Sequence, residues 1–172
     1  MSLYESSIPT YRQVVGGMIG VLDKAIAHYG EKKLEEASLL HDRLYPDMFP
    51  FTRQVQSFCD HAAGSSLRLA GKEANLPARD ETTLAGLRER CVKALAAVNS
   101  VSKADVDAHA DKDIVFSMGA RQVTMRGRDY MMHFAFPNFY FHATTAYNIL
   151  RHRGVVVGKR DFLGVVPGMP KA

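Results

Sequence analysis

Residues 128–152 read RDYMMHFAFPNFYFHATTAYNILRH, a run whose helical period sets the architecture of the chain. At about 100° per residue, one face of such a helix gathers side chains that lie within about 60° of His142. Most of these side chains are apolar, as expected of a helix that packs on a core, and three in the middle of the face are polar. The set comprises Met131, Ala135, Asn138, His142, Thr145, Ala146 and Ile149. Asn138 and His142 lie one turn apart, the spacing at which two side chains can reach one ligand.

The opposite face of the same helix is aromatic and carries Phe136, Tyr140 and Tyr147. A helix that faced only water would not carry three aromatic side chains there, so either another segment of the chain or a second subunit covers them. We favour a homodimer contact through this helix. Pro137 predicts a kink, because a proline inside a helix leaves the carbonyl of His133 without its hydrogen-bond donor.

Helical periodicity recurs in the rest of the chain. It predicts one helix over residues 11–29, one from Pro50 to about Leu69, and one capped by Thr82 or Thr83 that reaches about Ala97. A short helix is expected around residues 34–40, and a small β-hairpin is expected from residues 114–118 and 123–125. We therefore predict a mainly α fold: a four-helix bundle with a small β-hairpin before the last helix. Residues 1–172 form one domain, with a mostly irregular tail from residue 155.

Composition excludes several classes of protein. The chain has 172 residues, of which 47% are hydrophobic, and its formal net charge is +4. The basic residues form no stripe, so we expect no nucleic-acid partner. The first apolar run, residues 14–22, ends at Asp23 and is too short to cross a bilayer, so we expect no membrane partner and a cytoplasmic protein. Cys59 and Cys91 read as two buried free thiols, although a single bridge between them remains an alternative.

The second long helix carries the other polar candidates. Relative to its apolar face, His61 lies at the edge, and Gln54 lies on the same polar flank. In one interpretation His61 or Gln54 leans into the bundle and meets His142. In the other, which we favour, His61 is a boundary histidine in contact with solvent.

Three strings then resemble a known group of proteins. They are PNFYFH with TTAYNILR in residues 137–151, GKRDFLG in residues 158–164, and PDMFP with RQVQ in residues 46–56. The chain resembles an uncharacterised bacterial family of unknown function that is related to the DinB superfamily, over nearly its whole length. The resemblance implies a DinB-like four-helix bundle, often dimeric. The wider superfamily includes metal-binding proteins and transferases that use low-molecular-weight thiols.

The resemblance also implies where a metal site would lie. The superfamily site uses one histidine on the second helix and two on the last helix, four residues apart, the second of them nine residues before an arginine. His142 occupies the last of these places, nine residues before Arg151, whereas Asn138 occupies the place of the other histidine. The place on the second helix is open among Gln54, Ser57 and His61. An amide oxygen is a poorer ligand than imidazole for zinc or nickel. We therefore expect no tightly bound metal ion. If a divalent ion binds weakly, His61 and His142 are its candidate ligands.

Two functions follow from these residues. In the first, a polar pocket in the bundle binds a small molecule or a weakly held metal, with His142 as the candidate catalytic base or ligand. Superfamily analogy would make such an enzyme a small-molecule transferase or hydrolase. In the second, the protein is a non-enzymatic dimeric stress-response or binding module, in which Asn138 and His142 are structural. The pocket of the first function comprises Gln54, His61, Asn138, His142 and Thr145.

Overall fold

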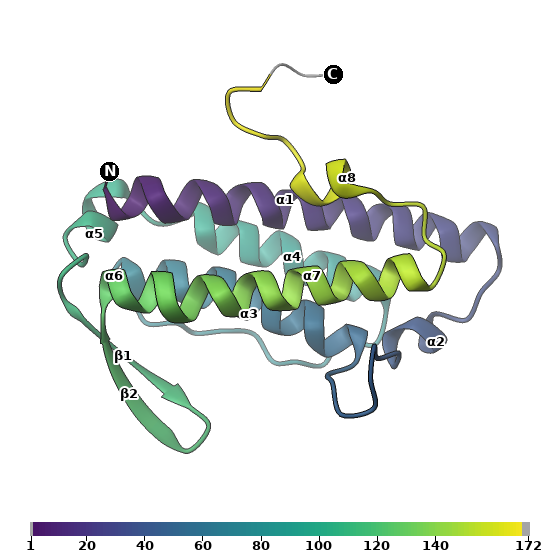
Figure 1. Ribbon diagram of the computed structural model, residues 1–172, viewed down its shortest axis with the longest axis horizontal. Coiled ribbons are helices and arrows are strands. Elements are labelled where there is room, and N and C mark those ends of the chain that lie inside the picture. The colour runs from purple at the N-terminus through teal and green to yellow at the C-terminus, as the bar shows by residue number, and fades with distance from the viewer. Residues whose placement is uncertain (1, 170–172) are drawn as a thin grey trace.

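Four long helices lie side by side in the computed structural model, which describes residues 2–169 (Figure 1). They are α1 (Leu3–Glu31), α3 (Phe51–Leu69), α4 (Leu84–Asn99) and α7 (Phe136–His152). Helix α4 packs against α1 and α3, and α3 packs in turn against α7. The predicted four-helix bundle is confirmed. No helix within residues 2–169 combines the length and the apolar character needed to cross a membrane.

Short elements join the long helices. Helix α2 (Glu36–Leu40) follows α1, and α5 (Lys103–Asp107) follows α4. Strands β1 (Asp113–Met118) and β2 (Arg121–Arg126) form the predicted antiparallel hairpin, which projects from one end of the bundle before the last helix (Figure 1). Ile114 pairs with Met125 across it.

Local capping sets where the long helices begin. Helix α1 begins eight residues before the predicted Tyr11, because Ser2 and Glu5 form a reciprocal capping box. Pro9 lies inside this helix without ending it. Thr83 caps α4 by accepting a hydrogen bond from the amide of Gly86 at 3.0 Å, as one of the two predicted alternatives requires.

A π-helical segment precedes the last long helix and accommodates Pro137. The helix starts with α6 (Gly127–Asp129), widens into η1 (Tyr130–Ala135) and continues as α7, in whose first turn Pro137 lies. The amide of Phe136 donates to the carbonyl of Met131, five residues earlier. A wider turn of this kind inserts one extra residue into the helix. The helix therefore contains a π segment just before Pro137, at the place where the sequence predicts a kink. Met131 and Ala135 still face the core.

The tail from residue 155 contains, within the described residues, one regular element, the short helix α8 (Lys159–Leu163), which folds back onto α1 (Figure 1). Lys24 pairs with Asp161 at 2.7 Å, and the Gln13 amide donates to the carbonyl of Leu163 at 3.0 Å. The approach is so close that a Cβ atom on Gly17 would lie 2.5 Å from the carbonyl oxygen of Phe162. Because Gly17 has no side chain, the tail can pack directly against the backbone of α1.

Replacing Gly17 by Ala should detach α8 from α1, whereas Gly20→Ala should not. Nothing lies within 4 Å of a Cβ atom built on Gly20, so alanine there should stabilise the helix by about 1 kcal/mol. Trypsin cleavage after Lys159 and Arg160, together with thermal unfolding, measures the difference. We expect faster cleavage in Gly17→Ala alone, and equal cleavage rates in both variants and the wild type would contradict this docking.

Candidate functional site

A chain of hydrogen bonds fixes the imidazole of His142, which lies midway along α7 and is only 8% exposed. Its Nδ1 atom lies 2.7 Å from Oε1 of Gln54 on α3. The amide nitrogen of Gln54 donates in turn to the backbone carbonyl of Phe49, at 3.1 Å. A carbonyl oxygen only accepts hydrogen bonds, so the Gln54 amide must direct its NH₂ group toward Phe49 and its oxygen toward His142. The Nδ1 atom of His142 therefore carries the proton, and Nε2 is left with a lone pair.

Aromatic rings surround this imidazole. The ring of Phe49 is nearly parallel to that of His142, at 10° with a centroid separation of 6.1 Å, and the ring of His61 lies at 16° and 5.7 Å. Phe134 meets the edge of His61 at 5.8 Å. Phe49 is 46% exposed and forms the rim toward solvent together with Phe141. The site is thus an aromatic cluster between α3 and α7 with two exposed rings at its edge.

Both imidazoles are held neutral. Burial, together with the positive charges of Arg53 and Arg79, lowers the pKa of His142 to about 4, against the opposing charge of Asp60. The pKa of His61 is likewise lowered to about 4. Burial is the largest cause, and repulsion from His142 is the second. Both side chains are therefore uncharged acceptors near neutral pH.

Arg53 places a positive charge at the rim. Its guanidinium lies over the ring of Phe49, 5.4 Å from the centroid. Burial and the charge of Arg79 lower its pKa. Within the part of the chain that the structure describes, no carboxylate pairs with Arg53, whereas Arg79 pairs with Asp60 at 2.6 Å. Arg53 is thus the cation available to a ligand beside His142.

The structure brings together only part of the predicted pocket. Gln54 and His61 both lie against His142. Asn138 instead donates to the carbonyl of Phe134 at 2.8 Å, and Thr145 donates to that of Phe141 at 2.7 Å, each four residues back along its own helix. Both hydrogen bonds are local to the last helix, and neither reaches His142.

Sequence reasoning missed Phe49 and Arg53. Both lie near the start of α3, where the turn at residues 46–50 enters the helix. The sequence did draw attention to this region, because residues 46–56 contain two of the strings on which the resemblance rests. Angular positions on a helix do not show how a preceding loop folds over its first turn.

The donor set does not fit a tightly held metal ion. Two imidazoles face one another, the oxygen of Gln54 already accepts from His142, and Asn138 bonds to its own helix. Among residues 2–169, no group of three or more His, Cys, Asp or Glu side chains is arranged to hold an ion. A structural or catalytic zinc site normally takes at least three protein ligands.

The aromatic face of α7 is partly covered by the chain itself. Phe136 packs on Tyr11 of α1, with ring centroids 5.1 Å apart, and Tyr147 packs on Phe162 of α8 at 5.7 Å. Tyr140 remains 39% exposed. Of the three residues predicted at a dimer interface, Tyr140 is therefore the one most open to a partner.

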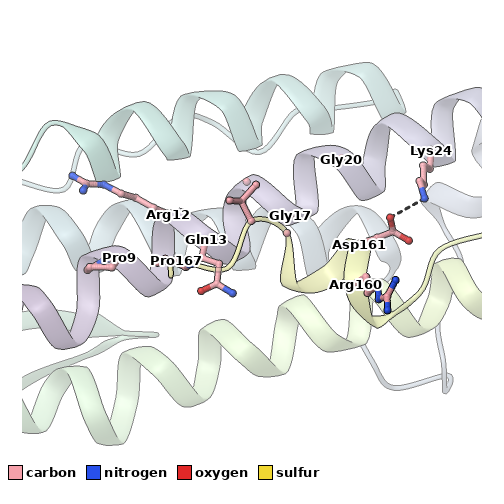
Figure 2. A pocket seen from close by; sticks show the side chains of 12 residues that line it. Pro9, Arg12, Gln13, Gly17, Gly20, Lys24, Arg160, Asp161 and Pro167 are labelled. Atoms are coloured by element: carbon pink, nitrogen blue, oxygen red, sulfur yellow. Dashed lines mark hydrogen bonds and ion pairs between the residues drawn. The ribbon is translucent and has the colours of Figure 1, made fainter. Parts of the chain in front are cut away.

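A groove of about 640 Å³ lies between α1 and the tail, and it is less organised than the site at His142 (Figure 2). Its floor is the bare backbone of α1 around Gly16 and Gly20. Figure 2 shows Arg12 and Arg160 at separate places along the groove, pointing away from one another, while Lys24 is engaged by Asp161. Because these charges do not converge, the groove offers no single point of recognition.

Comparison with known proteins agrees with the fold. The sequence pattern of DUF1993, a domain of unknown function, matches residues 3–163. The chain is also similar to a solved structure, a DinB family member protein from Shewanella denitrificans, at 38% sequence identity and a TM-score of 0.84. That similarity covers 98% of this chain and 96% of the other. Among curated proteins, none matches the chain.

Acidification should destabilise the fold between about pH 6.5 and pH 4. The folded chain holds both imidazoles at a pKa of about 4, whereas an unfolded histidine titrates near 6.5. In this window the unfolded chain binds more protons, so the free energy of unfolding falls as the pH falls, by at most about 1.4 kcal/mol per pH unit for each histidine. Urea unfolding at several pH values measures the slope. The double variant His61→Gln, His142→Gln should lose most of it, and an unchanged slope would contradict the burial of the two rings.

Proposed function

The chain belongs to the DUF1993 family, a domain of unknown function, and we propose that its bundle binds a small molecule at the imidazole of His142. The observation that carries this proposal is the relay from the Phe49 carbonyl through Gln54 to Nδ1. It leaves Nε2 as an acceptor, and within residues 2–169 no donor is bonded to that atom. A fixed, partly buried acceptor beside an open rim is the kind of polar group that orients a ligand in a mostly apolar site.

The chemistry of the site supports binding more strongly than proton abstraction. A pKa of about 4 makes His142 a weak base, because efficient general bases titrate near the working pH. A neutral imidazole instead accepts a hydrogen bond from an uncharged or weakly acidic O–H, N–H or S–H group. Arg53 would stabilise partial negative charge on the same ligand, and Phe49 would cover its apolar part. The ligand class is therefore a small, compact hydrogen-bond donor such as an alcohol, a phenol or a thiol.

A weakly held divalent ion, zinc or nickel, is the metal version of this proposal. His61 and His142 are its only candidate imidazole ligands within the site. Two such ligands give an easily dissociated ion. Measuring histidine resonances before and after addition of zinc or nickel separates this version from ligand binding without metal.

Replacing His142 by Gln should abolish ligand binding while the fold survives. Ligand-observed NMR with a panel of small alcohols, phenols and thiols identifies binders of the wild type, and the variants are then compared. His152→Gln is the matched control, because His152 is an exposed histidine at the end of the same helix. We expect binding to be lost in His142→Gln and retained in His152→Gln.

Two results would contradict the proposal. One is the absence of any binder in the panel, or a binder that His142→Gln retains. The other is a sharp fall in melting temperature in His142→Gln with no loss of binding, which would make the histidine structural.

A homodimer through α7 is the second candidate. It is favoured by two neighbouring exposed aromatic side chains, Tyr140 at 39% and Phe141 at 56%. In this version the protein is a binding module whose functional surface is the aromatic face of α7.

Tyr140→Glu should convert such a dimer to monomers, because a charge would replace an apolar contact at its centre. Light scattering measures the mass. Asn148→Glu, at another exposed position of α7, is the control that should leave the dimer intact. A wild type that is already monomeric, or an unchanged mass in Tyr140→Glu, would remove this candidate.

A further inference from the structure

Two cysteine side chains touch across the contact between α3 and α4. Cys59 on α3 and Cys91 on α4 are both buried free thiols, and their sulfur atoms lie 3.5 Å apart. They are the only two cysteines in the sequence. Because the sulfur atoms of a disulfide lie about 2.05 Å apart, each sulfur needs to move by less than about 1 Å to form the bond. Rotation of the two side chains about χ1 supplies a movement of that size.

A cavity gives small molecules a route to one of the two thiols. It has a volume of about 370 Å³ and lies between α3, α4 and the segment that joins them. Within residues 2–169, its lining includes Cys59 but not Cys91. Asn75, Pro77 and Lys93 also line it and are exposed, so the cavity reaches the surface of the molecule. An oxidant little larger than water therefore meets Cys59 first.

The surroundings of Cys59 keep it protonated near neutral pH. Burial, together with the contact to Cys91 and the charge of Asp60, raises the pKa of the Cys59 thiol well above its ordinary value, against the opposing charge of Arg90. The thiolate is the form that reacts with oxidants. Cys59 is therefore a slow nucleophile, and the pair stays reduced while oxidants are scarce.

We propose that Cys59 and Cys91 are a redox pair that hydrogen peroxide converts into a disulfide between α3 and α4. In the first step the Cys59 sulfur bonds to one peroxide oxygen, the O–O bond breaks, and the other oxygen leaves as water with the thiol proton. In the second step the Cys91 sulfur attacks the sulfur of this sulfenic acid, the S–O bond breaks, and a second water leaves with the Cys91 proton. The two thiols lose two electrons to the peroxide, and a small dithiol reverses the bond by exchange.

The disulfide would stabilise the bundle without rearranging the site at His142. It joins residues 32 apart in the sequence and so restricts the unfolded chain. We expect the melting temperature to rise by about 5 °C or more on oxidation. Cys59 and His61 are two residues apart, so their side chains diverge by about 200° around α3. The bond therefore forms on the side of α3 that faces α4, whereas His61 faces α7.

Peptide mapping by mass spectrometry after treatment with millimolar hydrogen peroxide measures the bond. Catalase removes the peroxide before the chain is unfolded and its free thiols are alkylated, so the result reports on the folded state. We expect a linked peptide pair containing Cys59 and Cys91, lighter by about 2 Da than the two free peptides, that a dithiol separates again. Peptide mapping also separates this change from the oxidation of methionine.

Two single variants test the order of the steps. Cys91→Ala removes the second thiol, so Cys59 should accumulate as a sulfenic acid that dimedone traps. Cys59→Ala is the matched control, because Cys91 does not line the cavity among the described residues and should remain alkylatable. Equal trapping in the two variants would overturn the assignment of Cys59 as the thiol that reacts first.

Other results would overturn the pair itself. They are two alkylated cysteines after the peroxide treatment, two separately oxidised sulfinic acids, or a disulfide that forms only between chains. A melting temperature that is unchanged or lower in the linked chain would overturn the stabilising role of the bond. His142→Gln should form the bond at the wild-type rate, which keeps this test independent of the ligand site.

Discussion

A backbone carbonyl oxygen cannot donate a hydrogen bond, and the site at His142 depends on this constraint. The carbonyl of Phe49 orients the amide of Gln54, and the amide selects the tautomer of His142. The result is that Nε2 is an unprotonated acceptor. Its protonation is set by the Phe49 carbonyl in the loop and by the Gln54 amide on α3, neither of which is charged. A carboxylate in the place of Gln54 would have favoured a protonated imidazole, whereas the amide leaves the ring neutral.

The fold supplies the other conditions of the site. Helix α7 buries His142 against α3, and the aromatic rings of Phe49 and Phe134 keep water from much of the two imidazoles. The π segment before Pro137 lets the helix pass the proline and present Phe134 and His142 to α3 together. The turn before α3 has two roles, because it begins that helix and places Phe49 at the rim.

Periodicity predicted the helices well because burial of one face is a local, repeated signal. The four long helices follow from it. The hairpin was predicted from its short β-type runs, and the capping preference of threonine left Thr82 and Thr83 as alternatives, of which Thr83 is the cap. Periodicity did not predict helix α8. A five-residue helix gains its stability from docking on Gly17 and from the Lys24–Asp161 pair rather than from its own sequence. The start of α1 was placed too late because Pro9 and a capping box at Ser2 lie before the apolar pattern.

The same distinction applies to the site. Angular position placed His142 on the buried face and left Gln54 and His61 as its candidate partners. It could not exclude Asn138 and Thr145, because their hydrogen bonds to the preceding turn compete with any bond across the bundle. Nor did it include Phe49, whose place depends on the path of the loop before α3, or Arg53, whose guanidinium lies over the Phe49 ring.

The tautomer of His142 can be read from the imidazole nitrogens in NMR spectra of chain labelled with ¹⁵N-histidine, recorded near neutral pH. We predict a neutral ring with the proton on Nδ1 and an unprotonated Nε2, and loss of that preference in Gln54→Leu. A proton on Nε2, or a charged ring at that pH, would contradict the relay from Phe49 through Gln54.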